Sequence, residues 1–196
     1  SYVTPFLLYE KETGDAQYRP VAQRIYNAWL QEFPNTYSTS IALWTEREIG
    51  LALEAAVSWY ELTGDQGALT RANALVAQWT TMANAGNGVP LVTVTQHEGG
   101  GGNQLVTSPW MSALYFQAAR RLNVLTGNTE VLQQVSRYAD WMETNGYFNG
   151  SVLGSSYAGI TAAYYLSGPT GPYTNETPAV GDFDHCLDVS GIVSFA

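Results

Sequence analysis

The sequence of 196 residues has a single cysteine, Cys186, and a single lysine, Lys11. With one cysteine the chain cannot form an internal disulfide, so the framework of a disulfide-rich domain is excluded. No apolar run is long enough to cross a bilayer. The net charge is −9 and the few basic residues form no stripe, so binding to nucleic acid or to an anionic membrane surface is not expected.

The near absence of lysine favours an exported protein, secreted or periplasmic. The chain starts at Ser1 rather than at methionine, which fits a processed or trimmed product, and no signal-peptide pattern is present. The sequence is rich in tyrosine, tryptophan, glycine and small polar residues. An aromatic ring covers the apolar face of a pyranose while amides and hydroxyls bond its rim. An oligo- or polysaccharide is therefore the favoured partner, and an ordinary tyrosine-rich core is the alternative.

One pattern occurs three times: an apolar helix end, the tripeptide Thr-Gly-Asp or Thr-Gly-Asn, and a second amphipathic helix. Glycine at a helix end adopts the left-handed conformation and satisfies the last carbonyls, and the Asp or Asn after it can cap the next helix. Each repeat is therefore predicted to be an antiparallel helical hairpin. The pivot glycines are Gly14, Gly64 and Gly127, and the tryptophans that close the second helices, expected in the core, are Trp29, Trp79 and Trp141.

The predicted fold is all-α, a single domain over residues 1–196 with three hairpins that are incomplete at both ends. Thr45 and Glu48 have the spacing of a capping box, and Ser108 is the expected cap before Pro109 at the first helical position. A small β-hairpin is predicted within 146–166, where Gly, Ser, Val and Tyr are frequent. The predicted helices cover 17–32, 45–63, 67–83, 109–126, 129–144 and 184–196, with the tail of a further helix before residue 14.

Three long connections, 33–44, 84–108 and 145–183, alternate with the short turns. Each joins a second helix back to the next first helix, so all three are expected at one end of the helix layer. Loops held by a rigid scaffold are where binding and catalytic residues usually lie.

The repeated Leu-Thr-Gly-Asp/Asn turns, the small-residue helix faces and the run Ser108-Pro109-Trp110-Met111 resemble the six-hairpin (α/α)6 toroid proteins. Many of these are glycoside hydrolases or polysaccharide lyases. A full toroid has about six hairpins, so the chain corresponds to about half of one. The resemblance implies either a missing second half, or a half toroid that pairs with a second copy as a homodimer; an open helical solenoid is the alternative.

In the toroids the inner helices start at the mouth of a funnel, and the long loops around that mouth carry the site. The resemblance implies that substrate-binding residues here are Trp44, Glu46, Gln104, Trp110, Tyr157 and His185. Hydrolysis of a glycoside needs one protonated and one ionised carboxyl group. Glu98 is the candidate acid and Asp182 or Asp184 the candidate base, although either Asp is also a plausible helix cap.

His97 is the fourth candidate catalytic residue, because the glycine run 99–102 after it could let His97 and Glu98 lean over a central cleft. A lyase would use a His or Tyr base, with His97 or His185 beside Tyr157, Tyr164 or Tyr165. Arg47 is the only basic residue near the predicted mouth, and the acidic chain repels a polyuronate, so hydrolysis is ranked above elimination. A non-catalytic module that binds a glycan or a protein is the third reading.

No metal and no cofactor are expected. His97, Glu98, Asp184 and His185 could form a mixed nitrogen and oxygen shell, but neither HExxH nor CxxC spacing is present. The glycine run lacks the Lys-Ser/Thr of a phosphate-binding loop, so nucleotide binding is not expected either.

Overall fold

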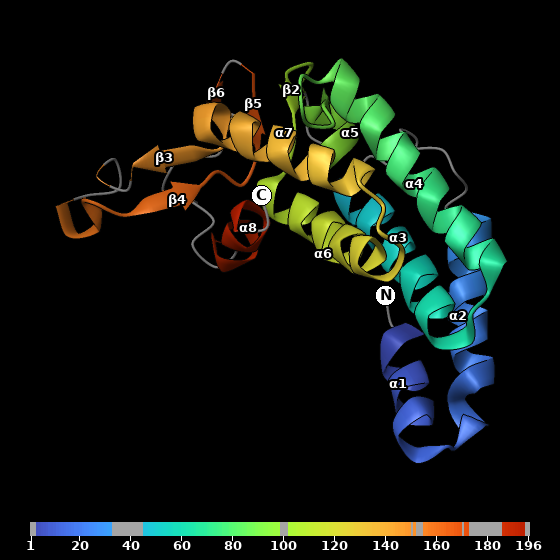
Figure 1. Ribbon diagram of the computed structural model, residues 1–196. Coiled ribbons are helices and arrows are strands. Elements are labelled where there is room, and N and C mark those ends of the chain that lie inside the picture. The colour runs from blue at the N-terminus through green and yellow to red at the C-terminus, as the bar shows by residue number, and fades with distance from the viewer. Residues whose placement is uncertain are drawn as a thin grey trace.

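The computed structural model describes residues 3–32, 45–98, 102–149, 151, 155–169, 171–172 and 186–194. Within these ranges the protein is predominantly helical, with three small two-stranded sheets (Figure 1). The helices are α1 (Val3–Thr13), α2 (Arg19–Glu32), α3 (Thr45–Thr63), α4 (Gln66–Ala85), α5 (Val94–Glu98), α6 (Pro109–Thr126), α7 (Glu130–Asn145) and α8 (Cys186–Val193). The strands are β1 (Val92–Thr93), β2 (Leu105–Val106), β3 (Tyr147–Asn149), β4 (Thr161–Ala163), β5 (Ser167–Gly168) and β6 (Gly171–Pro172).

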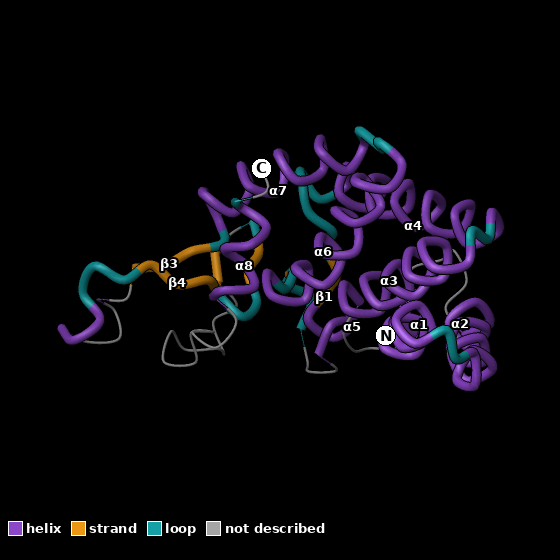
Figure 2. Tube along the Cα trace, turned by 60° about the horizontal axis from the view of Figure 1, so that its bottom comes forward, coloured by secondary structure: helices purple, strands orange, loops and turns teal. Residues whose placement is uncertain are grey.

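The long helices form two layers. Along the inner layer α1 contacts α3, α3 contacts α6 and α6 contacts α8, while α2, α4 and α7 each pack against the helix that precedes them in the chain. Figure 2 shows α8, α6, α3 and α1 following one another, with α7, α4 and α2 along the outer side. The predicted helical hairpins are confirmed, and their boundaries differ from the predicted ones by a few residues.

The three short turns have the conformation that their sequence predicts. Gly14, Gly64 and Gly127 have φ values of 73°, 74° and 72°, in the left-handed region that favours glycine. The residue after each glycine accepts a backbone N–H of the following turn: Gln17 N to Asp15 Oδ1 is 2.9 Å, Gly67 N to Asp65 Oδ1 is 2.7 Å, and Glu130 N to Asn128 Oδ1 is 2.9 Å.

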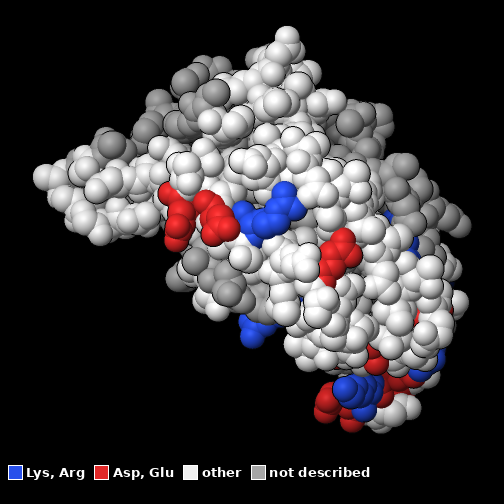
Figure 3. All heavy atoms as spheres, turned by 45° about the horizontal axis from the view of Figure 1, so that its top comes forward, with Lys and Arg blue, Asp and Glu red and all other residues white. Residues whose placement is uncertain are grey.

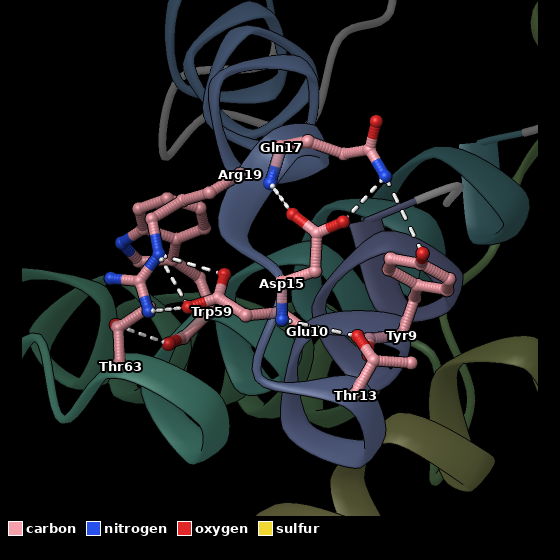
Figure 4. A network of polar contacts seen from close by, with 8 residues as sticks. All are labelled: Tyr9, Glu10, Thr13, Asp15, Gln17, Arg19, Trp59 and Thr63. Carbon is pink, nitrogen blue, oxygen red and sulfur yellow. Dashed lines mark hydrogen bonds and ion pairs between the residues drawn. The ribbon is translucent and has the colours of Figure 1, made fainter.

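The turn between α1 and α2 carries a polar network, drawn in Figure 4. Thr13 accepts from Asp15 N at 3.1 Å and donates to Tyr9 O at 2.7 Å, which closes the end of α1. Arg19 forms a two-pronged ion pair with Glu10, and this pair lowers the pKa of Glu10. Because these groups lie at the surface, the network shapes the turn more than it stabilises the fold.

The main apolar cluster of the core runs from α1 to α8, and a smaller one is formed by Val94, Val106 and Leu166. Within the main cluster the fully buried Trp79 stacks on Tyr115 with ring centroids 3.8 Å apart and planes 4° apart. Trp79 and Trp141 are buried as predicted, and Trp29 packs on the cluster while partly buried. The inner helices α3 and α6 approach closely at Gly50, where a Cβ atom would lie 2.7 Å from the backbone nitrogen of Tyr115.

The predicted β-hairpin is confirmed by β3 and β4, which pair antiparallel with Phe148 opposite Ala162. The connection 84–108 contains a second hairpin, β1 and β2, with Val92 opposite Val106. Between its strands lies the short helix α5, so His97 and Glu98 belong to a helix rather than to an open loop.

Two of the long connections meet at one end of the layer, as predicted. Thr107 and Ser167 exchange backbone hydrogen bonds of 2.8 and 3.0 Å, which ties the connection 84–108 to the connection 145–183. In Figure 1, α5, β2 and β5 lie together at the top of the view, whereas the short turn between α1 and α2 lies at the bottom. The third connection, 33–44, lies outside the described residues.

Candidate functional site

Glu46 and His97 lie 51 residues apart in the chain and form a fully buried ion pair. His97 Nε2 is 2.8 Å from Glu46 Oε2. The other carboxylate oxygen, Oε1, accepts two further bonds, from Thr107 Oγ1 at 2.8 Å and from the backbone N–H of Ser108 at 2.9 Å. One carboxylate therefore joins α3, α5 and the start of α6.

The position of Glu46 follows from the ends of two helices. Glu46 lies in the first turn of α3, and Ser108 is the residue immediately before α6, so the carboxylate lies where both helices present their positive ends. In a capping box, a glutamate in the first turn of a helix accepts the N–H of the cap residue of that same helix. Here a glutamate from a different helix does so for α6.

The predicted side-chain cap by Ser108 is wrong. Ser108 occupies the cap position and Pro109 follows as predicted, but the Ser108 hydroxyl makes no capping bond, and its buried oxygen has no hydrogen-bond partner. Glu46 takes the N–H of Ser108 instead, because the close packing of α3 on α6 brings the carboxylate to that amide.

Burial alone would raise the pKa of Glu46, because an enclosed carboxylate loses its hydration. The charge of His97, together with the bonds from His97, Ser108 and Thr107, outweighs this effect and lowers the pKa of Glu46 below its ordinary value. Glu46 is therefore ionised at neutral pH.

The expected placement of His97 over an open cleft is also wrong. His97 and Glu46 are both fully buried, so neither side chain is open to a substrate in this structure. The pair is arranged to hold the connection 84–108 against the inner helices. The predicted roles of His97 in catalysis and of Glu46 in substrate binding therefore gain no support from their position.

Trp110 lies at the same end of the inner layer with a cation above its ring. The guanidinium carbon of Arg47 is 4.6 Å from the ring centroid, and the ring of Tyr165 lies 6.1 Å from Trp110 at an angle of 36°. All three side chains are half-buried. An amphipathic aromatic surface of this kind fits the sugar-stacking role predicted for Trp110, which stays a prediction.

Glu48 is a titratable group whose spacing from Thr45 predicts a capping box. Its carboxyl is half-buried in the first turn of α3 and makes no hydrogen bond within the described part of the chain. Burial raises the pKa of Glu48 to about 7. Two positions along a helix correspond to about 200° of rotation, so Glu46 and Glu48 lie on different faces of α3 and do not form a carboxyl pair. The local sequence gave no signal of this burial, which depends on neighbouring helices.

The remaining predicted residues are placed as follows. Gln104 is half-buried beside β2, and its backbone carbonyl accepts the backbone N–H of Val94 at 2.9 Å. Glu98 and Tyr157 have a described backbone but no described side chain. Trp44, Asp182, Asp184 and His185 lie outside the described residues.

The ranges that the structure describes contain no group of three or more His, Cys, Asp or Glu residues that could hold a metal ion. Among the described helices, none is both long and apolar enough to cross a membrane. Comparison with known protein families, with curated proteins and with solved structures gave no match to this chain.

Proposed function

We propose that the protein is a glycoside hydrolase, or part of one, built as a partial (α/α) toroid. The observation that carries the proposal is the meeting of two long connections at the end of the layer where α3 and α6 begin. Ligand sites commonly lie on loops that a rigid helical scaffold brings together. The half-buried ring of Trp110 at that end supports a carbohydrate as the ligand.

The chemistry proposed requires a carboxyl group that keeps its proton at neutral pH. Glu98 is the first candidate acid, and Glu48 becomes a second, because burial raises its pKa to about 7. A carboxyl with such a pKa can donate a proton to the leaving oxygen of a glycoside and then regain a proton from water. The ionised partner is assigned to Asp182 or Asp184, as the sequence resemblance implies.

The hydrolase proposal is tested by measuring new reducing ends on a panel of glycans. The test variants are Glu98→Gln, Glu48→Gln, Asp182→Asn and Asp184→Asn, and the control is Glu143→Gln, since Glu143 is exposed on the outer helix α7. At least one test variant is expected to lose about 10²-fold or more in kcat, the usual effect of removing an acid or base. An active wild type whose four test variants keep full activity would overturn the assignment.

A second candidate function is a non-catalytic module that binds a glycan or a protein. The observation that favours it is the burial of Glu46 and His97. Both side chains are enclosed between packed helices and neither faces a substrate. This function predicts that no glycan in the panel is cleaved. For a polysaccharide lyase, Tyr164 is disfavoured as the base, because burial raises its pKa, whereas a tyrosine that abstracts a proton needs the opposite shift. A lyase would release an unsaturated product that absorbs in the near ultraviolet.

The partner proposed for the helix layer is a second copy of the chain, or a second half that completes the ring. A native mass of the purified protein, compared with its intact-chain mass, tests this expectation. A dimer supports the first partner. A stable monomer that binds or cleaves its glycan would contradict the need for either.

A further inference from the structure

The inner faces of α1, α3 and α6 line an open hollow of about 520 Å³. Its walls are mainly apolar and include Leu8, Leu51 and Leu114, while Gln117 and Arg121 contribute polar groups. A second hollow of about 380 Å³ adjoins the first and shares Gln117 and Arg121 with it. Concave sites of this size with apolar walls and a few polar groups are typical of ligand-binding sites.

The two hollows lie on a stripe that follows one face of α3 and one face of α6, with Arg47 and Trp110 one helical turn before its first lining residues. On both helices most of the lining positions are three, four or seven residues apart, which keeps them on one helix face. They are Leu51, Glu54 and Glu61 on α3, and Leu114, Gln117, Arg121 and Val124 on α6. At 1.5 Å per residue this stripe extends for about 21 Å from the stacked pair Arg47 and Trp110 to the ion pair of Arg121 with Glu61. We define these two hollows and the stripe as the inner groove.

Three charged groups of the inner groove, Glu54, Glu61 and Arg121, are paired with one another, and the exposed Arg120 also lines the second hollow. Arg121 Nη1 donates to Ser58 Oγ at 3.1 Å and lies 3.8 Å from Glu54 Oε1, and Arg121 Nη2 forms an ion pair with Glu61. Thr4 reaches the same cluster from α1, with its hydroxyl 2.6 Å from Ser58 Oγ. A charged ligand that binds Arg121, Glu54 or Glu61 would have to displace one of these contacts, and an anionic ligand would also face Glu54 and Glu61 on a chain of net charge −9.

Gln117 differs from the other polar residues of the inner groove. Its side chain is exposed, lines both hollows and forms no hydrogen bond within the described ranges. Its amide offers one acceptor and two donor hydrogens at the junction of the two hollows. Gln117 can therefore bond a ligand without breaking an existing contact.

We propose that the inner groove binds an extended, uncharged glycan chain lengthwise, from the Trp110 end towards Arg121. The identity of the ligand as a carbohydrate rests on the proposed function. The leucine side chains can pack against the apolar faces of sugar rings. The amide of Gln117 and the outer polar groups of the cluster around Arg121 can form hydrogen bonds with sugar hydroxyls. A purely alkyl ligand would cover these polar groups without bonding them, which is costly. A uronate chain would meet the paired acids.

The proposal is tested by titration calorimetry with hexasaccharides of three neutral linkage types and one uronate hexasaccharide of equal length. Leu8→Ala and Gln117→Ala are the test variants, and each has a matched control on the outer helix α7. Leu8 and Leu132 are 43 % and 45 % exposed, and Gln117 and Gln133 are both exposed helix glutamines. Because all four positions are at the surface, the variants are expected to fold.

The expected result is binding of at least one neutral hexasaccharide, a Kd raised about fivefold by each test variant, and no change in Leu132→Ala and Gln133→Ala. The proposed glycan binding in the inner groove would be overturned by any of three results: equal binding of the uronate, no binding of any neutral chain, or an unchanged Kd in both test variants. Binding with these effects but without cleavage would support the groove and contradict the hydrolase. Cleavage with unchanged Kd and KM in the test variants would support the hydrolase and contradict the groove.

Discussion

The substitution Glu46→Gln tests a fully buried interaction of the described structure. Gln keeps one oxygen that can accept from Thr107 and Ser108, but it removes the charge that faces His97 at 2.8 Å. Removing one member of a buried ion pair typically costs about 3–5 kcal/mol. Because two of the hydrogen bonds can remain, we expect the lower end, a loss of about 3 kcal/mol in the free energy of unfolding.

The measurement is denaturant unfolding at neutral pH followed by circular dichroism, with thermal melting as a second reading. For a domain of this size a loss of about 3 kcal/mol corresponds to a decrease in Tm of about 6–12 °C. The double variant Glu46→Gln with His97→Gln replaces the ion pair by two amides, and a coupling energy of about 2 kcal/mol or more is expected from the double-mutant cycle. A single variant within about 0.5 kcal/mol of wild type would refute the reasoning, since only a solvated pair costs so little.

The pH dependence supplies an independent check of the same pair. The folded pKa of Glu46 lies below its unfolded value, so the stability it provides is present above the unfolded pKa and is lost as the pH falls through the folded pKa. Wild type and Glu46→Gln should therefore differ most at neutral pH and converge in acid. A difference that stays constant down to about pH 2 would contradict the lowered pKa of Glu46.

Three further predictions address the helices and their ends. Gly127→Ala should lower the free energy of unfolding by about 1 kcal/mol, because the φ of Gly127 is 72°. The control Gly191→Ala in α8 should not lower it, because a Cβ atom at Gly191 meets no atom within 4 Å. Denaturant titration compares the two variants. Trp79→Ala should cost about 3–5 kcal/mol, read from the same titration, because the buried ring stacks on Tyr115; a loss below about 1 kcal/mol would contradict the packing. Glu48→Gln should raise Tm at about pH 8 and leave it unchanged at about pH 4, because a folded pKa of about 7 makes the wild type lose stability as the pH rises above the unfolded pKa; an equal Tm at both pH values would contradict the burial of Glu48.

The local elements could be predicted from the sequence because their signals are local. A left-handed glycine followed by Asp or Asn ends one helix and starts the next within three residues, so the turns at Gly14, Gly64 and Gly127 and the helices between them were found correctly. The tryptophans at matching offsets indicated the buried side of the second helices for the same reason, and Trp79 is fully buried.

The site could not be predicted in the same way, because its contacts join residues far apart in the chain. No local pattern shows that Glu46 meets His97 and the N–H of Ser108, or that Ser108 leaves its own hydroxyl unbonded. Likewise, the burial that raises the pKa of Glu48 depends on how neighbouring helices pack around α3.

What the sequence by itself determined is the order of the helices and the short turns between them, since hydrogen bonding within a helix and the φ of a glycine depend on adjacent residues. Only the tertiary structure decided which carboxyl groups are enclosed and which faces remain open. The close approach of α3 and α6 at Gly50 placed Glu46 at the start of α6 and left Gln117 on the open inner face. The free energy of a charge depends on every group within a few ångströms, and that neighbourhood is known only once the helices are packed.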